Sequence, residues 1–477
     1  MFAQRQEGTL LQERDLVVVV PGILGSVLRA PNGREAWNAS FAMAAHVLGD
    51  FCEALEALRL PPGLGDGPPP ARYALQPESL MPGSQVWPGF WAGAGYPALL
   101  KSLRQHLKNP AQQLMIFTYD WRLSNQYNAR LLMDRAKRRL HQWRREGGEP
   151  DAQLQLVCHS MGGLIGRYFL HVLGGTEMTR RAYTIGTPYV GSVKAVRVLT
   201  GHLLPPWAGR FGERLRSVAE TFPSIAELLP AYRCVTKPRG MGSPGTGGGA
   251  GDDGPADAIR LLDCHVPGLS RQAVERSADF HTTIRKREAE SGDRLVHVFT
   301  GGGQPTEQSV VIDPSGLRFT CQQRGFDHGG DGTVPRFSSV PPHWEDDSPA
   351  LFYPSTHVGL TSHRELLRSL TRKIAAAPSS ATLTPARSLS LHVDPVVLAG
   401  QTVPLQVHTD CPDLTLDARL QHVGGTPYGR PLPLRPDGTG NYTADLTLPP
   451  GIWHITVETT KESPASQVDD LIVVAPY

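Results

Sequence analysis

The stretch QLQLVCHSMGGLIGRY, residues 153–168, decides the fold. Its first half is an apolar run typical of a buried β-strand, and a helical pattern begins immediately after Ser160. Such a tight strand-to-helix turn, called a nucleophile elbow, holds a serine hydroxyl clear of the sheet. Gly162 and Gly163 supply the small neighbours that a crowded turn needs. For this segment alone an ordinary strand-to-helix junction remains an alternative, because Cys158 replaces the first glycine of the G-x-S-x-G pattern.

Strands and helices alternate on both sides of the elbow. The run LVVVVPGILGS, residues 16–26, predicts a strand buried on both faces that ends in a glycine-bounded turn. Further strands are predicted over 114–122 (running into a loop), 181–188 (ending in a turn) and 295–301, and helices over 96–106, 128–146 and 362–376. This alternation requires a doubly wound, mainly parallel sheet, and together with the elbow it predicts an α/β-hydrolase fold.

The predicted catalytic domain, residues 1–378, contains two departures from this alternation. At about 192–290, helical pieces such as 224–229 flank a Gly/Pro/Ser/Asp-rich tract at 240–255, which predicts an inserted cap or lid with a mobile tip. The long excursion at 30–94 is typical of a lid or binding loop. Its aromatic residues either pack beneath the loop or meet lipid; they are Trp37, Trp87, Phe90 and Trp91.

The character of the sequence changes after Pro378. Short segments of alternating apolar and polar residues are separated by turn signals such as Pro436-Asp437-Gly438. This pattern predicts an antiparallel, immunoglobulin-like β-sandwich over residues 379–477. The sandwich either braces the catalytic domain or contacts a protein, carbohydrate or membrane partner.

Composition narrows the class of protein. A net charge of +2, with 40% hydrophobic and 19% charged residues, describes a soluble protein and argues against a dedicated nucleic-acid binder. The first eight residues lack the apolar core of a signal peptide, and no run approaches the roughly 20 apolar residues of a membrane span, so a cytoplasmic location is expected. Among six scattered cysteines, Cys234 and Cys264 could close a loop, or ligate a metal with His265, or remain free thiols. We expect neither a metal nor a cofactor.

A serine nucleophile needs a histidine to accept its proton and a carboxylate to orient that histidine. In α/β hydrolases these residues follow in the order Ser, Asp, His, and Ser160, Asp331 and His357 fill that order. The last two lie in glycine-bearing loops just beyond predicted strand ends. Other candidates are Asp327 and Asp313 for the acid, and His328, His343 and His363 for the base.

The predicted reaction is acyl transfer. Ser160 attacks an ester carbonyl, His357 relays the proton and Asp331 stabilises the imidazolium. The backbone amides of Ile23 and Met161 are the predicted oxyanion hole, since Gly22 and Gly25 would let the turn after the first strand direct its amides to the substrate.

Motifs in a fixed order run through residues 16–376: VPGILGS at 20–26, YDWR at 119–122, HSMGG at 159–163, GTP at 186–188 with Gly191 and Ser192, GDGTV at 330–334, and His357. In this order they resemble the oxyanion strand, Y-D-W-R segment, elbow, following strand end, acid loop and base of the lecithin:cholesterol acyltransferase-like family of α/β hydrolases. That family includes phospholipid:diacylglycerol acyltransferases and lysosomal phospholipases. The resemblance implies a lipid ester substrate, of the glycerophospholipid class, together with a mobile lid and no cofactor. It does not explain the sandwich.

Two classes of function follow. The first is a serine lipase, phospholipase or O-acyltransferase that meets its lipid substrate in transient contact with a membrane surface, with a soluble carboxylesterase acting on small esters as its nearest variant. The second is a non-catalytic binding protein on a hydrolase scaffold, in which the sandwich is the working module. Chemical labelling of Ser160 distinguishes these two classes.

Overall fold

The computed structural model describes residues 14–33, 35–38, 55–81, 85–87, 91–93, 96–147, 150–204, 209–236, 258–291, 295–344, 350–375, 389–394, 396–409, 411, 413–423, 427–460 and 466–475. The predicted cap tip at 240–255 and the junction near residue 378 lie outside these residues, so the predicted domain limits stay predictions. The side chains of Trp87, Phe90 and Trp91 lie outside them as well.

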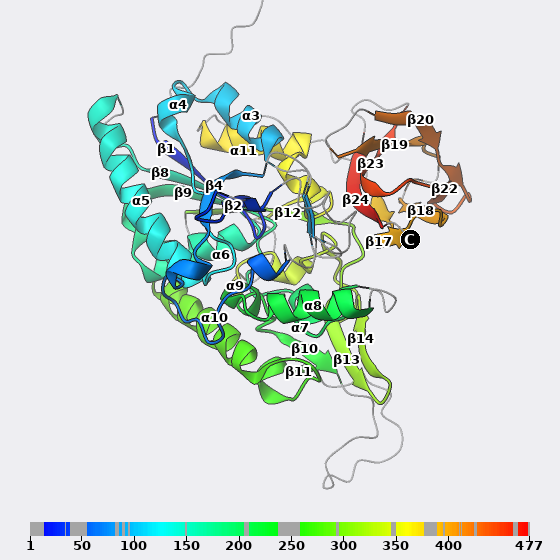
Figure 1. Cartoon of the computed structure of the whole chain (residues 1–477). Coiled ribbons are helices and arrows are strands. Elements are labelled where there is room, and N and C mark those ends of the chain that lie inside the picture. The colour runs from blue at the N-terminus through cyan, green and yellow to red at the C-terminus, as the bar shows by residue number, and fades with distance from the viewer. Residues whose placement is uncertain are drawn as a thin grey trace, which may run out of the picture.

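A six-stranded parallel sheet forms the centre of the molecule (Figure 1). Its strands are β1 (Leu16–Val20), β7 (Leu114–Ile116), β8 (Leu154–His159), β9 (Thr179–Ile185), β12 (Val296–Gly302) and β15 (Leu351–Pro354). They lie in the order β15-β12-β9-β8-β1-β7, and every neighbouring pair is parallel. The chain reverses its direction of travel across the sheet between β1 and β8, and such switch points bind ligands at the carboxyl ends of the strands. The predicted α/β-hydrolase fold is confirmed.

Helices cover both faces of this sheet. Helices α3 (Pro97–His106) and α11 (Arg364–Ile374) cover one face, where Val17 and Val19 join their leucines in one apolar cluster. Helices α5 (Asn125–Glu146) and α6 (Met161–Arg167) cover the other face, where Leu16 and Val18 are buried. Burial on both faces explains why β1 reads as a continuous apolar run.

The long excursion at 30–94 contains short β-structure. Strand β2 (Ser26–Arg29) pairs with β3 (Glu35–Trp37) and β4 (Gln76–Leu80), and β5 (Gln85–Trp87) pairs with β6 (Trp91–Gly93). Trp37 is buried, its ring meets Trp121 edge to face, and its indole N–H donates to the carbonyl of Leu24 at 3.0 Å. The aromatic residues of this segment were predicted either to pack beneath the loop or to meet lipid, and Trp37 packs beneath it.

The predicted cap region is mostly helical. It contains α7 (Val193–Leu199), α8 (Gly209–Ala219), α9 (Pro223–Ala226), β10 (Arg233–Thr236), β11 (Ile259–Arg260) and α10 (Arg271–Ser291). Strand β10 also pairs in parallel with β13 (Ser309–Asp313), which pairs with β14 (Gly316–Thr320). The region thus shares a small sheet with residues beyond 290, because β10 leaves an unpaired edge that β13 fills.

Glu227 is a fully buried carboxyl that ties this region to the start of helix α5. Its Oε2 accepts the Asn125 amide at 2.7 Å, and its Oε1 faces the Arg276 guanidinium at 3.2 Å. Burial raises the pKa of Glu227 to about 7, although the Asn125 amide and Arg276 act in the opposite direction.

Replacing Glu227 with glutamine should therefore stabilise the protein relative to the wild type as the pH rises. The folded wild type keeps a proton that the unfolded chain releases between pH 4.5 and about 7, so its free energy of unfolding falls across that interval. The loss amounts to about 3 kcal/mol, and glutamine cannot ionise. Urea unfolding of both proteins at pH 5 and pH 8 measures the difference. An equal difference at both pH values would contradict the raised pKa.

The C-terminal part is a two-sheet sandwich, as predicted. One sheet holds β16 (Ser390–His392), β18 (Val403–His408), β22 (Asn441–Leu446) and β21 (Arg435–Pro436); the other holds β17 (Val396–Leu398), β24 (Gln467–Ala475), β23 (Gly451–Thr459), β19 (Leu416–His422) and β20 (Pro427–Pro433). All described pairs are antiparallel except β17 with β24.

Strand β24 belongs to two cores. Val468, Ile472 and Val474 lie in the sandwich core, whereas Leu471 and Val473 lie in the main core of the α/β part. Because both faces of β24 are apolar, its sequence does not alternate.

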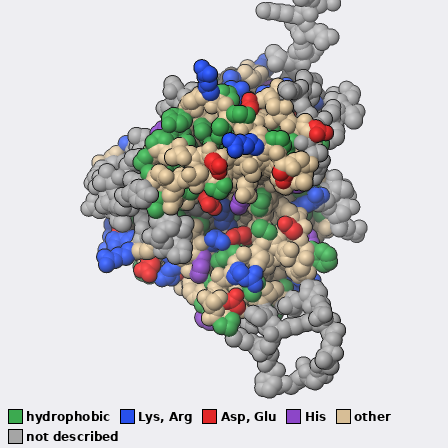
Figure 2. All heavy atoms as spheres, turned by 90° about the vertical axis from the view of Figure 1, so that its right-hand side faces the viewer, with side chains coloured by type: hydrophobic (Ala, Val, Ile, Leu, Met, Phe, Trp, Pro, Cys, Tyr) green, Lys and Arg blue, Asp and Glu red, His purple; other side chains and the backbone are tan. Residues whose placement is uncertain are grey.

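On the side of the molecule shown in Figure 2, Lys/Arg and Asp/Glu side chains are interspersed outside the grey atoms, so neither sign of charge dominates there.

None of the described helices is both long enough and apolar enough to span a bilayer. The cytoplasmic location stays a prediction.

Candidate active site

The turn at Ser160 is a strained strand-to-helix junction. Ser160 has φ 53° and ψ −126°, a backbone conformation that side-chain-bearing residues rarely adopt. The turn also brings α6 against its neighbours: a Cβ on Gly162 would lie 2.5 Å from the carbonyl oxygen of Val20, and one on Gly163 would lie 2.5 Å from Thr187 Cγ2. Both glycines are therefore required by space.

Cys158, which departs from the G-x-S-x-G pattern, is accommodated by a third glycine. Its Sγ points at Gly166, where an added Cβ would lie only 2.8 Å away. Burial raises the pKa of the Cys158 thiol to about 12, so it stays neutral. In the G-x-S-x-G pattern a glycine at position 158 leaves room for the helix. Here Cys158 fills that room, and the missing side chain of Gly166 supplies it.

Gly166→Ala should consequently destabilise the wild type by about 1–3 kcal/mol through overpacking. In a Cys158→Ala background the remaining Cβ lies 3.8 Å from the new methyl group, which is an ordinary contact, so the cost should vanish. Urea unfolding of the two single variants and the double variant measures this coupling. Purely additive effects would show that Cys158 and Gly166 do not compete for the same space.

The structure brings Ser160, His357 and Asp331 into one hydrogen-bonded line. Ser160 Oγ lies 2.9 Å from His357 Nε2, and His357 Nδ1 lies 2.7 Å from Asp331 Oδ2. The three residues are 0%, 1% and 0% exposed. With Nδ1–H donating to the carboxylate, Nε2 is left as the acceptor for the serine hydroxyl, which is the tautomer that a general base needs.

Asp331 is held by its own loop. Its Oδ1 accepts the amides of Thr333 at 3.0 Å and Val334 at 2.7 Å, and its carbonyl oxygen accepts the amide of His357 at 2.7 Å. The carboxylate therefore presents Oδ2 to the histidine in a fixed orientation. The loop of Asp331 and the loop of His357 are also tied together through their backbones.

The competing acid and base candidates have other contacts. Asp327 accepts Gln308 Nε2 and the Gly329 amide, and Asp313 accepts the amide and hydroxyl of Ser315. The three remaining histidines also make other contacts: His363 accepts the Leu366 amide at the start of α11, His328 packs on Phe337, and His343 lies 3.9 Å from Glu288.

The two predicted oxyanion donors lie in turns beside Ser160. Met161 is the first residue of α6, and the N–H of such a residue has no acceptor within its own helix. Ile23 lies in the turn after β1, where Leu24 has φ 62°. The predicted role of the glycines needs correction here. Gly22 and Gly25 are not left-handed but are needed for space, since a Cβ on Gly22 would lie 2.9 Å from Ser160 Cβ and one on Gly25 would lie 2.8 Å from Pro21 Cβ.

A chain of hydrogen bonds between uncharged groups, which the sequence did not reveal, links the turn after β1 to the backbone of His357. The Gly22 amide donates to Tyr96 Oη at 2.8 Å, and Tyr96 Oη lies 3.0 Å from His159 Nδ1. On the other side of its ring, His159 Nε2 lies 3.4 Å from the carbonyl oxygen of His357. Burial first, and then His357, lower the pKa of His159 to about 3, so the ring is neutral and accepts the tyrosine proton.

Tyr96→Phe should lower kcat about tenfold and leave KM nearly unchanged, because the Gly22 amide and His159 both lose a partner and the oxyanion turn is less well fixed. Ester kinetics measures the effect. Tyr183→Phe is the matched control, since Tyr183 is equally buried and its hydroxyl donates to Gln155 at 2.9 Å. An equal loss of kcat in both variants would assign the effect to general destabilisation.

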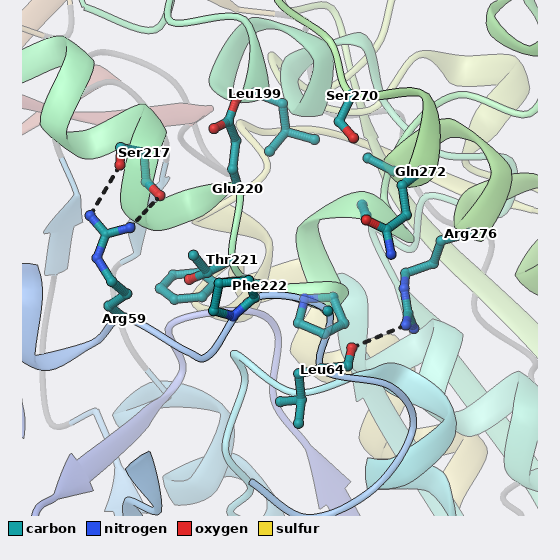
Figure 3. A pocket seen from close by; sticks show the side chains of 15 residues that line it. Arg59, Leu64, Leu199, Ser217, Glu220, Thr221, Phe222, Ser270, Gln272 and Arg276 are labelled. Carbon is teal, nitrogen blue, oxygen red and sulfur yellow. Dashed lines mark hydrogen bonds between the residues drawn. The ribbon is translucent and has the colours of Figure 1, made fainter. Parts of the chain in front are cut away.

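A cavity of about 350 Å³ lies between the 59–64 segment and helices α7 to α10 (Figure 3). The guanidinium of Arg59 donates to the carbonyl and hydroxyl of Ser217, both at 3.0 Å, and Arg276 donates to the Leu64 carbonyl at 3.2 Å. None of Ser160, His357 and Asp331 lines it. This cavity is therefore separate from the hydrogen-bonded line.

Cys234 and Cys264 are not joined by a disulfide. Within the described ranges, no three His, Cys, Asp or Glu side chains are grouped so as to hold a metal ion.

Residues 92–240 match the family model of lecithin:cholesterol acyltransferase. No curated protein matches the chain. Solved structures with a similar chain path include the Tle4–Tli4 complex (TM-score 0.47, 14% identity, 76% of this chain and 97% of that chain). Others are Bacillus licheniformis lipase BlEst2 in its mature form (0.33, 11%, 76% and 92%) and phospholipase PlaB from Legionella pneumophila (0.31, 9%, 95% and 90%).

The family match covers the elbow, the strand that follows it and the start of the cap region. It agrees with the resemblance carried by the sequence motifs. Over residues 92–240 the chain is thus similar to the lecithin:cholesterol acyltransferase family, and the sheet and helices around this segment form an α/β-hydrolase fold.

Proposed function

We propose that the protein cleaves glycerophospholipids or other long-chain acyl esters through an acyl-serine intermediate on Ser160. The observation that carries this proposal is the line from Ser160 Oγ through His357 to Asp331, with contacts of 2.9 and 2.7 Å, at a strained elbow. A buried serine, histidine and carboxylate in this order supply a nucleophile, its base and the group that orients the base.

In the proposed reaction, the Ser160 oxygen attacks the ester carbonyl carbon while His357 Nε2 takes the hydroxyl proton. The carbonyl π electrons move to oxygen, and the amides of Ile23 and Met161 stabilise the resulting oxyanion. The intermediate collapses, the alcohol leaves with the proton from His357, and an acyl-serine remains. Water or a second alcohol then attacks the acyl-serine by the same steps in reverse, and either a free acid or a new ester is released.

The enclosure of the site supports a long-chain substrate. Ser160 is 0% exposed, and the proposal includes a movement of neighbouring groups that lets an ester reach Oγ. A lipid aggregate supplies apolar surface that can offset such an opening, whereas a short soluble ester does not.

A panel of p-nitrophenyl esters of rising acyl length, together with phosphatidylcholine vesicles, tests the proposal. The wild type should prefer long chains and release fatty acid from vesicles, and Ser160→Ala should do neither. Labelled phosphatidylcholine with a sterol or glycerol acceptor then separates hydrolysis from transfer. Preference for short soluble esters would favour a carboxylesterase and overturn the lipid substrate. Absence of any Ser160-dependent turnover would favour a binding protein.

A further inference from the structure

The loop that carries His357 rests on the C-terminal sandwich. Thr356, the residue immediately before the histidine, is buried, and its Oγ1 donates to the carbonyl of Asp469 in β24 at 2.7 Å. The same hydroxyl accepts the Gly359 amide at 3.3 Å. A Cβ on Gly359 would lie 3.1 Å from Asp469 Oδ2, so the loop and the strand are in close contact. One hydroxyl therefore fixes both sides of His357 against β24.

The loop that carries Asp331 is tied to the sandwich by a different side chain. Gln304 is buried, and its Nε2 donates to the carbonyl of Leu389 at 3.1 Å while its Oε1 accepts the Leu391 amide at 3.0 Å. The backbone amide of Gln304 donates to the Gly330 carbonyl at 3.0 Å, and Gln304 pairs with Asp331 in a β-bridge. A single residue thus connects the first sandwich strand to the acid loop.

The apolar contact between the two parts makes these bonds rigid. Ile452, Leu471 and Val473 of the sandwich are buried in the main core of the α/β part. These three side chains are buried, and a buried hydrogen bond whose partners are fixed by packing holds its geometry better than an exposed one.

We propose that the C-terminal β-sandwich positions the catalytic base and acid, and that Thr356 and Gln304 are the positioning residues through which it acts. This inference rests on the proposed function of the site. Neither residue takes part in the line from Ser160 to Asp331, and each acts through its neighbour. Productive geometry must be held to roughly 0.5 Å, and a displacement of about 1 Å at the reacting groups can cost roughly a hundredfold in rate, so loss of either bond is expressed in kcat.

Four variants of the full-length chain test the proposal. Thr356→Val removes the hydroxyl and keeps the shape, whereas Thr356→Ser keeps the hydroxyl. Gln304→Met removes both amide contacts at similar volume. Thr459→Val is the matched control: Thr459 is buried in the sandwich, and its hydroxyl contacts only the backbone of Ser466, at 2.8 and 3.4 Å, among the described hydrogen bonds. For each variant, Tm, kcat and KM on a long-chain ester, and the rate of Ser160 phosphonylation by a fluorophosphonate are measured well below the lowest Tm.

We expect Thr356→Val and Gln304→Met each to lower kcat and the phosphonylation rate about tenfold, with KM changed by less than about twofold. Thr356→Ser, which keeps the hydroxyl, should have a kcat and a phosphonylation rate close to those of the wild type. Thr459→Val should lower Tm and leave kcat unchanged. If Thr356→Val does not fold, Gln304→Met and Thr356→Ser still decide the outcome.

Two negative results are distinguishable. If the wild type is active and Thr356→Val and Gln304→Met keep wild-type kcat while losing Tm as Thr459→Val does, the contacts only stabilise the fold, and this inference is overturned while the proposed function stands. If the wild type neither turns over esters nor reacts with the fluorophosphonate at Ser160, both are overturned.

Discussion

Ser160→Ala is expected to lower kcat on a long-chain ester by a factor on the order of 10⁵ to 10⁶, because no covalent intermediate can form and the remaining groups act only on water. Ser160 Oγ lies 2.9 Å from His357 Nε2. Alanine keeps the Cβ and the same backbone conformation, so the fold is preserved. Initial-rate kinetics with purified proteins measures the loss.

Two controls accompany this variant. Its Tm should lie within a few degrees of the wild-type value, since Ser160 makes no other side-chain hydrogen bond among the described residues. Phospholipid vesicles should still bind to it with wild-type affinity, because substrate contacts elsewhere are retained. Residual activity above about 1% of the wild-type value would mean that another group carries the reaction.

Asp331→Asn should lower kcat by roughly 10⁴-fold and leave KM within a few fold of the wild-type value. The asparagine amide group would offer an N–H to His357 Nδ1, 2.7 Å away, so the ring would turn to the tautomer that carries its proton on Nε2. Such a ring cannot accept the Ser160 proton. The pH dependence of kcat/KM, measured from pH 5 to 9, should show partial recovery at high pH, where hydroxide replaces the base.

Asp327→Asn is the matched control for this prediction. Asp327 lies four residues away in the same loop, and its Oδ1 accepts Gln308 Nε2 at 2.7 Å and the Gly329 amide at 2.7 Å. Its loss should cost less than about fivefold in kcat, because it contacts neither His357 nor Ser160. The same loss in both variants would contradict the assignment of Asp331 as the acid.

Local patterns predicted the elements that dominate the site. The apolar run before Ser160 and the two glycines after it fix the elbow, because a tight turn leaves few alternatives. The order of Ser160, Asp331 and His357 along the chain follows from a sheet whose strands end at one edge, so residues nearly two hundred positions apart could be placed together.

Long-range contacts account for what the sequence did not predict. Tyr96 is 63 positions from His159, and no local pattern indicates that its hydroxyl bonds both His159 and Gly22. Strand β24 was not predicted because its two faces belong to different cores, which removes the alternation of a half-buried strand. The close approach of Gly166 to Cys158 Sγ likewise becomes visible only once the elbow is folded and packed.

The most direct test of the central claim is covalent labelling of the wild type with a fluorophosphonate, followed by peptide mass spectrometry. We predict a single adduct on the peptide that contains Ser160, with labelling abolished in His357→Ala. If Ser160 of the folded protein does not react, even with phospholipid vesicles present, or if a different serine is modified, the result would contradict the account.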